Sequence, residues 1–228
     1  MIQTEMTEKT LQLFKKKAPE NLVNWNEFTS ALLIEVKRGN DIFTSSAVAI
    51  APQIILTAAH SVEGVDSAKV FLDSHYNMFS KNFLKVSDII IHPEYDQRNS
   101  NFLNDIAIII LDKPLPSSVM IHEIHHGNLL QGELARIGFG GRFSQNARNF
   151  TNPKYIALPC DHRYFMCEDK FSVVGDSGGP VFIRTEEGLK LAGLHSTLEG
   201  DKLTYSVKVS SYIKWIQNVL SRSNSLTL

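Results

Sequence analysis

Between residues 30 and 209, apolar residues occur in short runs separated by turn residues such as Gly39, Asn40 and Pro52. The runs are rich in β-branched side chains, and this pattern predicts short β-strands. We expect strands at SALLIEV (30–36), IFTSSAVAIA (42–51), QIILTAA (53–59), KVFL (69–72), VSDIII (86–91), DIAIIIL (105–111), GELARIGFG (132–140), YIALP (155–159), GGPVFI (178–183), GLKLAGLHS (188–196) and LTYSVKV (203–209). No helices alternate with these runs, so the pattern favours an all-β fold of paired barrels over an α/β sheet.

The last apolar pattern before the C-terminus has a different period. In SSYIKWIQNVL (210–220), the apolar residues Ile213, Ile216, Val219 and Leu220 are spaced as on one face of a helix. We therefore expect one helix after the final strand.

The first 24 residues also carry a helix-like pattern, which includes Leu11, Phe14 and a lysine run at 15–17 and ends at Pro19. We expect residues 1–24 to be an N-terminal extension or a propeptide, and residues 25–228 to form the folded domain. The continuous apolar segment of a secretory signal does not follow these charges. The lysine run is typical of a solvated helix face.

Length and charge narrow the classes of function. The 228 residues suit one large all-β domain or two small halves that share a core, and 43% of hydrophobic residues can fill it. With 23 basic and 24 acidic residues, the net charge of -1 favours neither nucleic acid nor an anionic membrane. No apolar run is long enough to span a bilayer. We expect no nucleic-acid partner and no membrane span, and the oligomeric state does not follow from the sequence.

Three short motifs carry candidate chemistry. GDSGGPVF (175–182) surrounds Ser177 with small residues, which leave its hydroxyl exposed and its backbone free to bend. LTAAHS supplies the imidazole of His60, and NDIAIIIL supplies the carboxylate of Asp105. A serine hydroxyl needs a base to take its proton and a third group to orient that base. The N–H groups of Gly175 and Ser177 are candidates to bind the oxyanion that forms when the hydroxyl attacks a carbonyl.

Each motif alone also has a structural interpretation. A GDSGG string can be a loop turn, a histidine after an apolar strand is more often structural than catalytic, and an aspartate can simply flank a buried strand. The three motifs together, in one order and in their expected strand contexts, favour catalysis.

At these three places the sequence resembles the trypsin/chymotrypsin family of serine peptidases, whose chain order is also His, Asp, Ser. The resemblance extends more weakly over residues 30 to 217 and includes IIIHPEYD at 89–96. It implies two six-stranded antiparallel β-barrels with a C-terminal helix docked on the second barrel. His60 and Asp105 would come from the first barrel and Ser177 from the second, with the site between them. It further implies a serine endopeptidase that acts on protein or peptide substrates and needs no metal or organic cofactor.

Activation is the first departure from the family. In the resembling enzymes a freshly cut N-terminus, usually Ile-Val-Gly-Gly, inserts its amine against the aspartate before the serine. This chain retains that aspartate, Asp176, but lacks the tetrapeptide, and the nearest candidate by distance from His60 is NLVN at 21–24. A buried carboxylate without a partner is costly. Either a new amine near Leu22 or an unidentified side chain must meet Asp176, and the first alternative predicts that activity requires cleavage there.

The pocket for the residue before the cut bond is the second departure. Counting back from Ser177 places Phe171 where trypsin has an aspartate, so specificity for lysine or arginine is not expected. Ser172 follows, and the strand GLHST brings His195 directly before Ser196. A hydroxyl and a histidine at matching positions resemble glutamyl endopeptidases and exfoliative toxins, and they could bind a carboxylate. We expect Phe171, Ser172, His195 and Ser196 to line the pocket, with glutamate preferred; alternatively, His195 only fills the strand.

Leu198 and Thr204 stand where many relatives have glycine, and they would narrow this pocket. The bulky pocket and the missing tetrapeptide favour an alternative function, a catalytically silent pseudopeptidase that acts as a binding module. The intact set of His60, Asp105 and Ser177 argues against that alternative.

The remaining histidines favour structural roles. A triad needs one imidazole within reach of the serine, so His92 is interpreted as structural. The cluster His122, Glu123, His125 and His126 lacks the paired-histidine spacing of metalloprotease helices, so we interpret it as a surface turn and expect no metal site.

Only two cysteines are present, Cys160 and Cys167, and whether they are bonded stays open. Where resembling animal enzymes have a disulfide beside the catalytic histidine, this chain has Ser45 and Ser61, and Val173 replaces another common half-cystine. The resemblance implies an extracellular or periplasmic location, but the chain shows no signal peptide. The compartment therefore also stays open.

Overall fold

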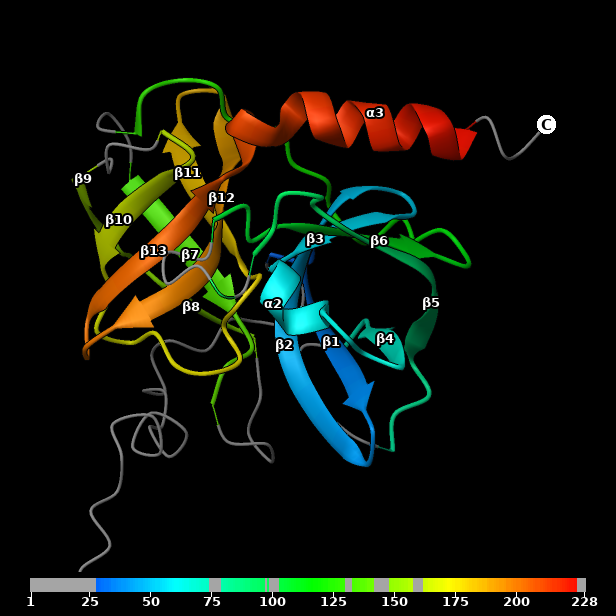
Figure 1. The fold of residues 1–228 in the computed structure, drawn as a ribbon. Helices are drawn as coiled ribbons and strands as arrows, with labels where there is room; N and C mark the ends of the chain where they lie inside the picture. The colour runs from blue at the N-terminus through cyan, green and yellow to red at the C-terminus, as the bar shows by residue number, and fades with distance from the viewer. Residues whose placement is uncertain are drawn as a thin grey trace, which may run out of the picture.

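The computed structural model describes residues 28–73, 79–96, 98, 103–129, 133–141, 148–157 and 162–224. Two β-units lie side by side, and the C-terminal helix runs along one end of the pair (Figure 1). The expected all-β fold is confirmed. Residues 1–24, which we expected to form an extension or a propeptide, lie outside the described residues.

The first unit is a closed antiparallel barrel in which the strand order is β1-β2-β3-β6-β5-β4. Its strands are β1 (Ala31–Arg38), β2 (Asp41–Ala51), β3 (Ile54–Thr57), β4 (Ser67–Phe71), β5 (Phe83–Ile91) and β6 (Ala107–Leu111). Because successive side chains on a strand point to opposite faces, β1 contributes to two cores. Leu32 and Ile34 pack in a cluster confined to this barrel. Leu33 packs in a cluster that continues to Ile137 and Phe182 of the second unit, so one core joins the two units.

The second unit contains seven strands, in the order β8-β7-β11-β12-β13-β10-β9. They are β7 (Glu133–Gly138), β8 (Asn149–Thr151), β9 (Lys154–Ala157), β10 (Tyr164–Glu168), β11 (Pro180–Thr185), β12 (Gly188–Glu199) and β13 (Leu203–Lys208). The expected six-stranded closed barrel is therefore a curled seven-stranded sheet here. Its two edge strands, β8 and β9, are separated in sequence only by Asn152 and Pro153. A proline cannot donate to a strand ladder, so the chain turns a corner here between β8 and β9.

The strand predictions hold for most runs, but β8 and β10 were not predicted. In β10, Tyr164, Phe165 and Cys167 are buried, and the run YFMCE has no regular polar alternation that would mark a strand. The predicted C-terminal helix is confirmed as α3 (Ile213–Asn224), preceded by a 3₁₀ turn, η4 (Val209–Tyr212).

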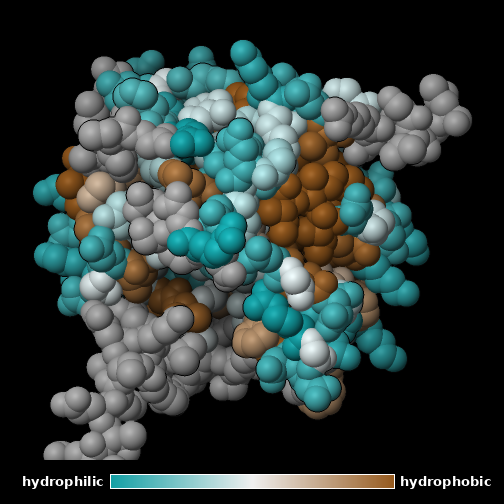
Figure 2. Space-filling model, viewed as in Figure 1, coloured by the Kyte–Doolittle hydropathy of each residue, from teal (hydrophilic) through white to brown (hydrophobic). Residues whose placement is uncertain are grey.

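The apolar face of α3 packs on the shared core through Ile216 and Val219, with Trp215 and Leu220 partly buried against the same cluster. In Figure 1, α3 starts beside the second unit and extends over the first, so it does not dock on the second unit alone. Figure 2 shows an apolar surface region below this helix, over the first barrel, on an otherwise mainly hydrophilic face. Within the described residues, no helix has the length and hydrophobicity needed to cross a membrane.

Candidate active site

His60 and Asp105 form a bonded pair at the edge of the first barrel. His60 lies on the short helix α2 (Ala59–Val62), which follows β3 directly. Its Nδ1 lies 2.8 Å from Asp105 Oδ2, and its backbone N–H donates to Asp105 Oδ1 at 2.9 Å. The His60 side chain is 25% exposed, whereas that of Asp105 is fully buried. The carboxylate therefore holds both the ring and the backbone of His60, and this favours the tautomer in which Nδ1 carries the proton.

Ser196 completes the surroundings of Asp105. Its hydroxyl donates to Asp105 Oδ2 at 2.6 Å, and its carbonyl oxygen accepts from the hydroxyl of Ser177 at 3.3 Å. In the pairing of β12 with β13 the register shifts between His195 and Thr197, so Ser196 is the extra residue of a β-bulge. A bulge re-aims a side chain. We expected Ser196 to line the pocket; its side chain instead supports Asp105.

The charge state of Asp105 follows from these contacts. Burial alone would raise the pKa of this carboxyl, but the interaction with His60 and the hydrogen bond from Ser196 outweigh burial and hold the pKa below its usual value. Asp105 is therefore a carboxylate at neutral pH. In that form it can stabilise a protonated His60.

Asn104 fixes the backbone before Asp105, a role that sequence reasoning missed. It has a positive φ of 59°, and its side-chain oxygen accepts from Arg163 Nη1 at 2.9 Å and from the Tyr212 hydroxyl at 3.1 Å. Its side-chain nitrogen donates to the Glu94 carbonyl at 2.9 Å. Asparagine is one of the few non-glycine residues that tolerate this backbone region. An asparagine before the aspartate was the available signal.

Ser177 lies in the turn between β10 and β11, against the first barrel. Its carbonyl oxygen accepts from the N–H of Ser46 at 2.9 Å and from the hydroxyl of Ser45 at 2.7 Å, both on β2. A Cβ at Gly178 would overlap the side chain of Thr57 and the carbonyl of Ser46. The glycine after the serine is therefore required by the close contact between the two barrels.

The N–H groups of Gly175 and Ser177 are available to a ligand. Among the residues that the structure describes, neither group donates to another protein atom. The carbonyl of Val174 accepts from Gly141 at 3.2 Å, and that of Asp176 accepts from Gly179 at 3.0 Å. Because the N–H of a trans peptide points opposite to its C=O, these two bonds direct both N–H groups away from the loop interior. Gly175 has a φ of 97°, which favours glycine.

Comparisons with known proteins agree with this geometry. A family profile described as Trypsin matches residues 26–216 of the chain. The chain belongs to the trypsin family of serine proteases.

Among the curated relatives of this trypsin-family chain is Serine protease 7 of Drosophila melanogaster, which is 27% identical over 84% of this chain. The chain spans 61% of the length of that protein. Chymotrypsin-like elastase family member 1 of Bos taurus is 24% identical over 87% of both chains. Trypsin-4 of Rattus norvegicus is 26% identical over 76% of this chain and 78% of that protein. A solved structure titled HL collagenase shares the fold, with a TM-score of 0.74 at 20% identity over 89% of this chain and 98% of that chain.

Asp176, the trypsin-family aspartate that precedes the serine, is fully buried and meets an internal side chain. Its Oδ2 lies 2.8 Å from Nη1 of Arg136, and the Arg136 side chain is 1% exposed. The backbone N–H groups of Gly140 and Val173 donate to its two oxygens at 2.8 and 3.0 Å. The sequence left open whether a new amine or a side chain meets Asp176, and the structure contains a side-chain partner, Arg136. The expected amine near Leu22 lies outside the described residues.

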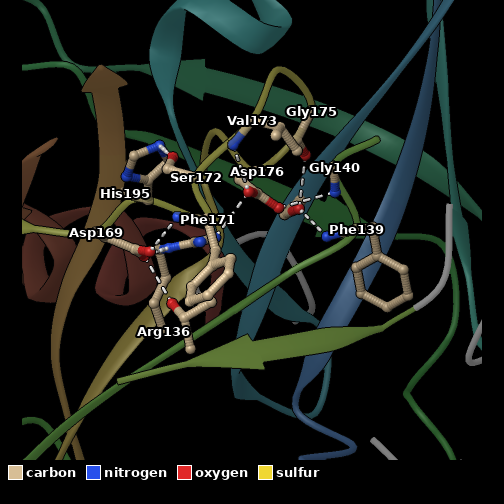
Figure 3. Close-up of polar contacts among 12 residues, drawn as sticks. Arg136, Phe139, Gly140, Asp169, Phe171, Ser172, Val173, Gly175, Asp176 and His195 are labelled. Carbon is tan, nitrogen blue, oxygen red and sulfur yellow. Dashed lines mark hydrogen bonds and ion pairs between the residues drawn. The ribbon is translucent and has the colours of Figure 1, made fainter. Parts of the chain in front are cut away.

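The predicted pocket residues come together beside this loop (Figure 3). The hydroxyl of Ser172 lies 2.9 Å from Nε2 of His195, and both residues are buried. Phe171 is half-buried, and its N–H donates to Asp169 at 3.0 Å. The hydroxyl of Thr204 donates to the Cys167 carbonyl at 3.2 Å. The structure therefore pairs a hydroxyl with an imidazole at the position that the sequence indicated.

The other histidines lie outside this arrangement. His92 packs against the rings of Tyr212 and Trp215, at centroid distances of 5.2 and 4.9 Å, in a structural position. The segment that we interpreted as a surface turn is extended, because Ile124 forms a parallel bridge with Leu191 of β12. His122 beside it packs on Phe182. In the described ranges, no three histidine, cysteine, aspartate or glutamate side chains form a group that could hold a metal ion.

Near His60, hydroxyls stand where the resembling animal enzymes have half-cystines. The Oγ atoms of Ser45 and Ser61 lie 2.8 Å apart and form a hydrogen bond. Cys167 is a free, buried thiol in the structure. Burial raises the pKa of this thiol to about 12, and Asp169 adds to the shift. Cys160 itself lies outside the described residues.

Proposed function

We propose that the protein is a serine endopeptidase that forms an acyl-enzyme on Ser177. The observation that supports this most strongly is the chain of contacts from Ser177 through Ser196 to Asp105, with His60 bonded to the same carboxylate. Two N–H groups without protein acceptors in the described residues lie on the same turn. A nucleophile, an oriented base and an oxyanion site are the parts that acyl transfer requires.

In this mechanism, the Ser177 hydroxyl oxygen bonds to the carbonyl carbon of the peptide while its proton passes to His60. The carbonyl oxygen becomes an oxyanion and accepts hydrogen bonds from the N–H groups of Gly175 and Ser177. The C–N bond then breaks as His60 returns the proton to the leaving amine, which leaves an ester on Ser177. Water attacks this ester in the second half, with His60 again as base and then acid, and releases the acid product.

The test combines a fluorophosphonate probe, which reacts only with an activated serine, with the Ser177→Ala variant. We expect the probe to label the wild-type chain and not the variant, and kcat to fall on the order of 10⁶-fold. The melting curve should stay unchanged, since the substitution removes one half-buried oxygen and no core volume. An unlabelled and inactive wild-type chain would support the pseudopeptidase alternative instead.

We further propose that the preferred residue before the scissile bond is glutamate. The pair of Ser172 and His195 supports this, because a carboxylate in a buried slot needs hydrogen-bond partners that offset its desolvation. A hydroxyl and an imidazole can both donate to it, and Phe171 would form an apolar floor beneath the methylene groups.

Substrates that differ only in this residue test the preference. In the His195→Ala variant, kcat/KM for a glutamyl substrate should fall at least 100-fold more than for a leucyl substrate, because a polar site that loses its partner discriminates steeply. A glutaminyl substrate of the same shape is the matched control for charge. A wild-type profile headed by phenylalanine or leucine would mean that Phe171, Leu198 and Thr204 define an apolar pocket.

A further inference from the structure

Arg136 lies between two buried carboxylates, one on each side of the guanidinium (Figure 3). Its Nε lies 2.6 Å from Asp169 Oδ2, and its Nη1 lies 2.8 Å from Asp176 Oδ2. The side chains of Arg136 and both aspartates are at most 1% exposed. The planar guanidinium can bind two acceptors in different directions at once, which an ammonium group cannot do with the same geometry.

The Asp176 side of Arg136 fixes the loop that carries the oxyanion donors. Asp176 Oδ1 accepts from the N–H of Gly140, and Oδ2 accepts from the N–H of Val173. A Cβ at Gly138 or Gly140 would overlap the carboxylate, so the strand end is shaped to receive it. The position of Asp176 therefore fixes the peptide plane that follows it, which carries the N–H of Ser177. The N–H of Gly175 lies one peptide further back, in the plane whose carbonyl accepts from Gly141.

The Asp169 side of Arg136 fixes the backbone of Phe171 and Ser172, two residues of the proposed pocket. Asp169 Oδ1 accepts from the N–H of Phe171 at 3.0 Å, and its backbone carbonyl accepts from the N–H of Ser172 at 3.3 Å. Thr151 on β8 donates at 2.6 Å to Asp169 Oδ2, the same oxygen that contacts Arg136. The backbone of the pocket floor is thus bonded to a residue that Arg136 holds.

Arg136 and Asp169 stabilise each other's charged form. Burial lowers the pKa of Arg136, but Asp176 and Asp169 outweigh burial and raise it. Burial raises the pKa of Asp169, but Arg136 outweighs it and holds the pKa below its usual value. Arg136 and Asp169 are therefore both charged at neutral pH.

We propose that Arg136 is a positioning residue that holds the oxyanion hole and the pocket floor together, in place of the amine that a cut N-terminus supplies in the resembling enzymes. The intact chain is then active without cleavage near Leu22, because the partner of Asp176 is already part of β7. Since one side chain bonds both carboxylates, its loss impairs turnover and selectivity together. This inference rests on the proposed peptidase activity.

The first experiment labels the full chain, with Met1 verified by mass spectrometry, with a fluorophosphonate. Labelling of the intact chain at the same rate as a chain cut near Leu22 supports the proposal. Labelling only after the cut would overturn the inference and leave the proposed function standing. No labelling of either form would overturn the proposed function and this inference with it.

The second experiment measures ester and peptide hydrolysis by Arg136→Met and by the triple variant Arg136→Met/Asp169→Asn/Asp176→Asn. The triple variant leaves no buried charge unpaired in this group, so it keeps the test valid if the single variant does not fold. We expect kcat to fall 10²- to 10³-fold, as when an oxyanion donor is lost. We also expect selectivity to fall: the ratio of the kcat/KM values of the two best substrates, which differ only in the residue before the scissile bond, should decrease at least tenfold.

Leu111→Ala on β6 is the control for lost stability, because Leu111 is a core residue of the first barrel that is 1% exposed. It should lower the melting temperature without changing kcat or selectivity.

Methylguanidinium added to Arg136→Ala should restore part of kcat, since it can occupy the vacated space between the carboxylates. Folded Arg136 variants that retain the wild-type kcat and selectivity would overturn the proposal.

Discussion

Asp105 and Asp176 are two fully buried carboxylates, one in each half of the active site. Asp105 accepts the backbone N–H of His60, Asp176 accepts those of Gly140 and Val173, and each carboxylate contacts a nitrogen-bearing side chain. For Asp105 the partner is His60, whose side chain is 25% exposed. For Asp176 the partner is Arg136, whose side chain is 1% exposed.

The two pairs differ in what their nitrogen partner can do. A histidine exchanges its proton near neutral pH, whereas an arginine stays protonated. His60 also reaches solvent and therefore substrate, whereas Arg136 is enclosed. The comparison teaches that a buried carboxylate supports catalysis or structure according to the acidity and accessibility of its partner, since the carboxylates themselves are bonded in similar ways.

The largest effect that would sharpen this comparison is expected for Asp105→Asn. The amide keeps the shape but favours the wrong imidazole tautomer, so kcat should fall about 10⁴-fold, as for the equivalent change in the Ser-His-Asp template. Melting temperatures would show that the fold is retained. A loss of less than tenfold would mean that His60 does not depend on Asp105 for its orientation.

The pH dependence of the free energy of unfolding should differ between the wild-type protein and a variant in which a paired carboxylate is replaced by an amide. The folded-state pKa values of Asp105 and Asp169 lie below the ordinary value. Each group therefore contributes stability that is fully present above about pH 4 and is lost as the pH falls through the folded-state pKa. Asp169→Asn should be less stable than wild type at pH 7 but should lose less stability between pH 5 and 2, measured by urea denaturation. Parallel pH profiles for the two proteins would contradict this assignment.

Ser196→Ala should have the smallest effect of the three. It removes the hydroxyl that donates to Asp105 but keeps the backbone carbonyl that accepts from Ser177. A hydrogen bond to a charged group is worth roughly 1.5 to 3 kcal/mol, so we expect kcat/KM to fall about tenfold. Thr197→Ala, one residue further on the same strand, is the control. Equal kcat/KM values for Ser196→Ala and Thr197→Ala would show that Asp105 keeps its position without the Ser196 hydroxyl.

Local patterns in the sequence predicted the parts of the site that depend on neighbouring residues. The small residues around Ser177 and the apolar runs beside His60 and Asp105 are visible within eight residues or fewer. The alternation in the first barrel likewise follows from each strand alone. The second unit was predicted less well, because β8 has only three residues and β10 has no clear period.

The contacts that join distant segments could not be predicted in the same way. Arg136 lies in ELARIG, where an arginine in a strand is usually read as solvent-facing, and its partners are 33 and 40 residues further along the chain. The side chain of Ser196 reaches Asp105 only because of a bulge, which pairing with β13 creates. Such roles depend on register and burial, and those are set by tertiary packing.

The carbonyl oxygen of Ser177 accepts two hydrogen bonds from β2, across the junction of the barrels. A hinge motion that separated the barrels would break both bonds and carry the nucleophile away from His60. These bonds therefore favour a site whose width is set before a substrate arrives. An inhibitor that binds here should meet a preformed surface, with little backbone movement between the free and bound states.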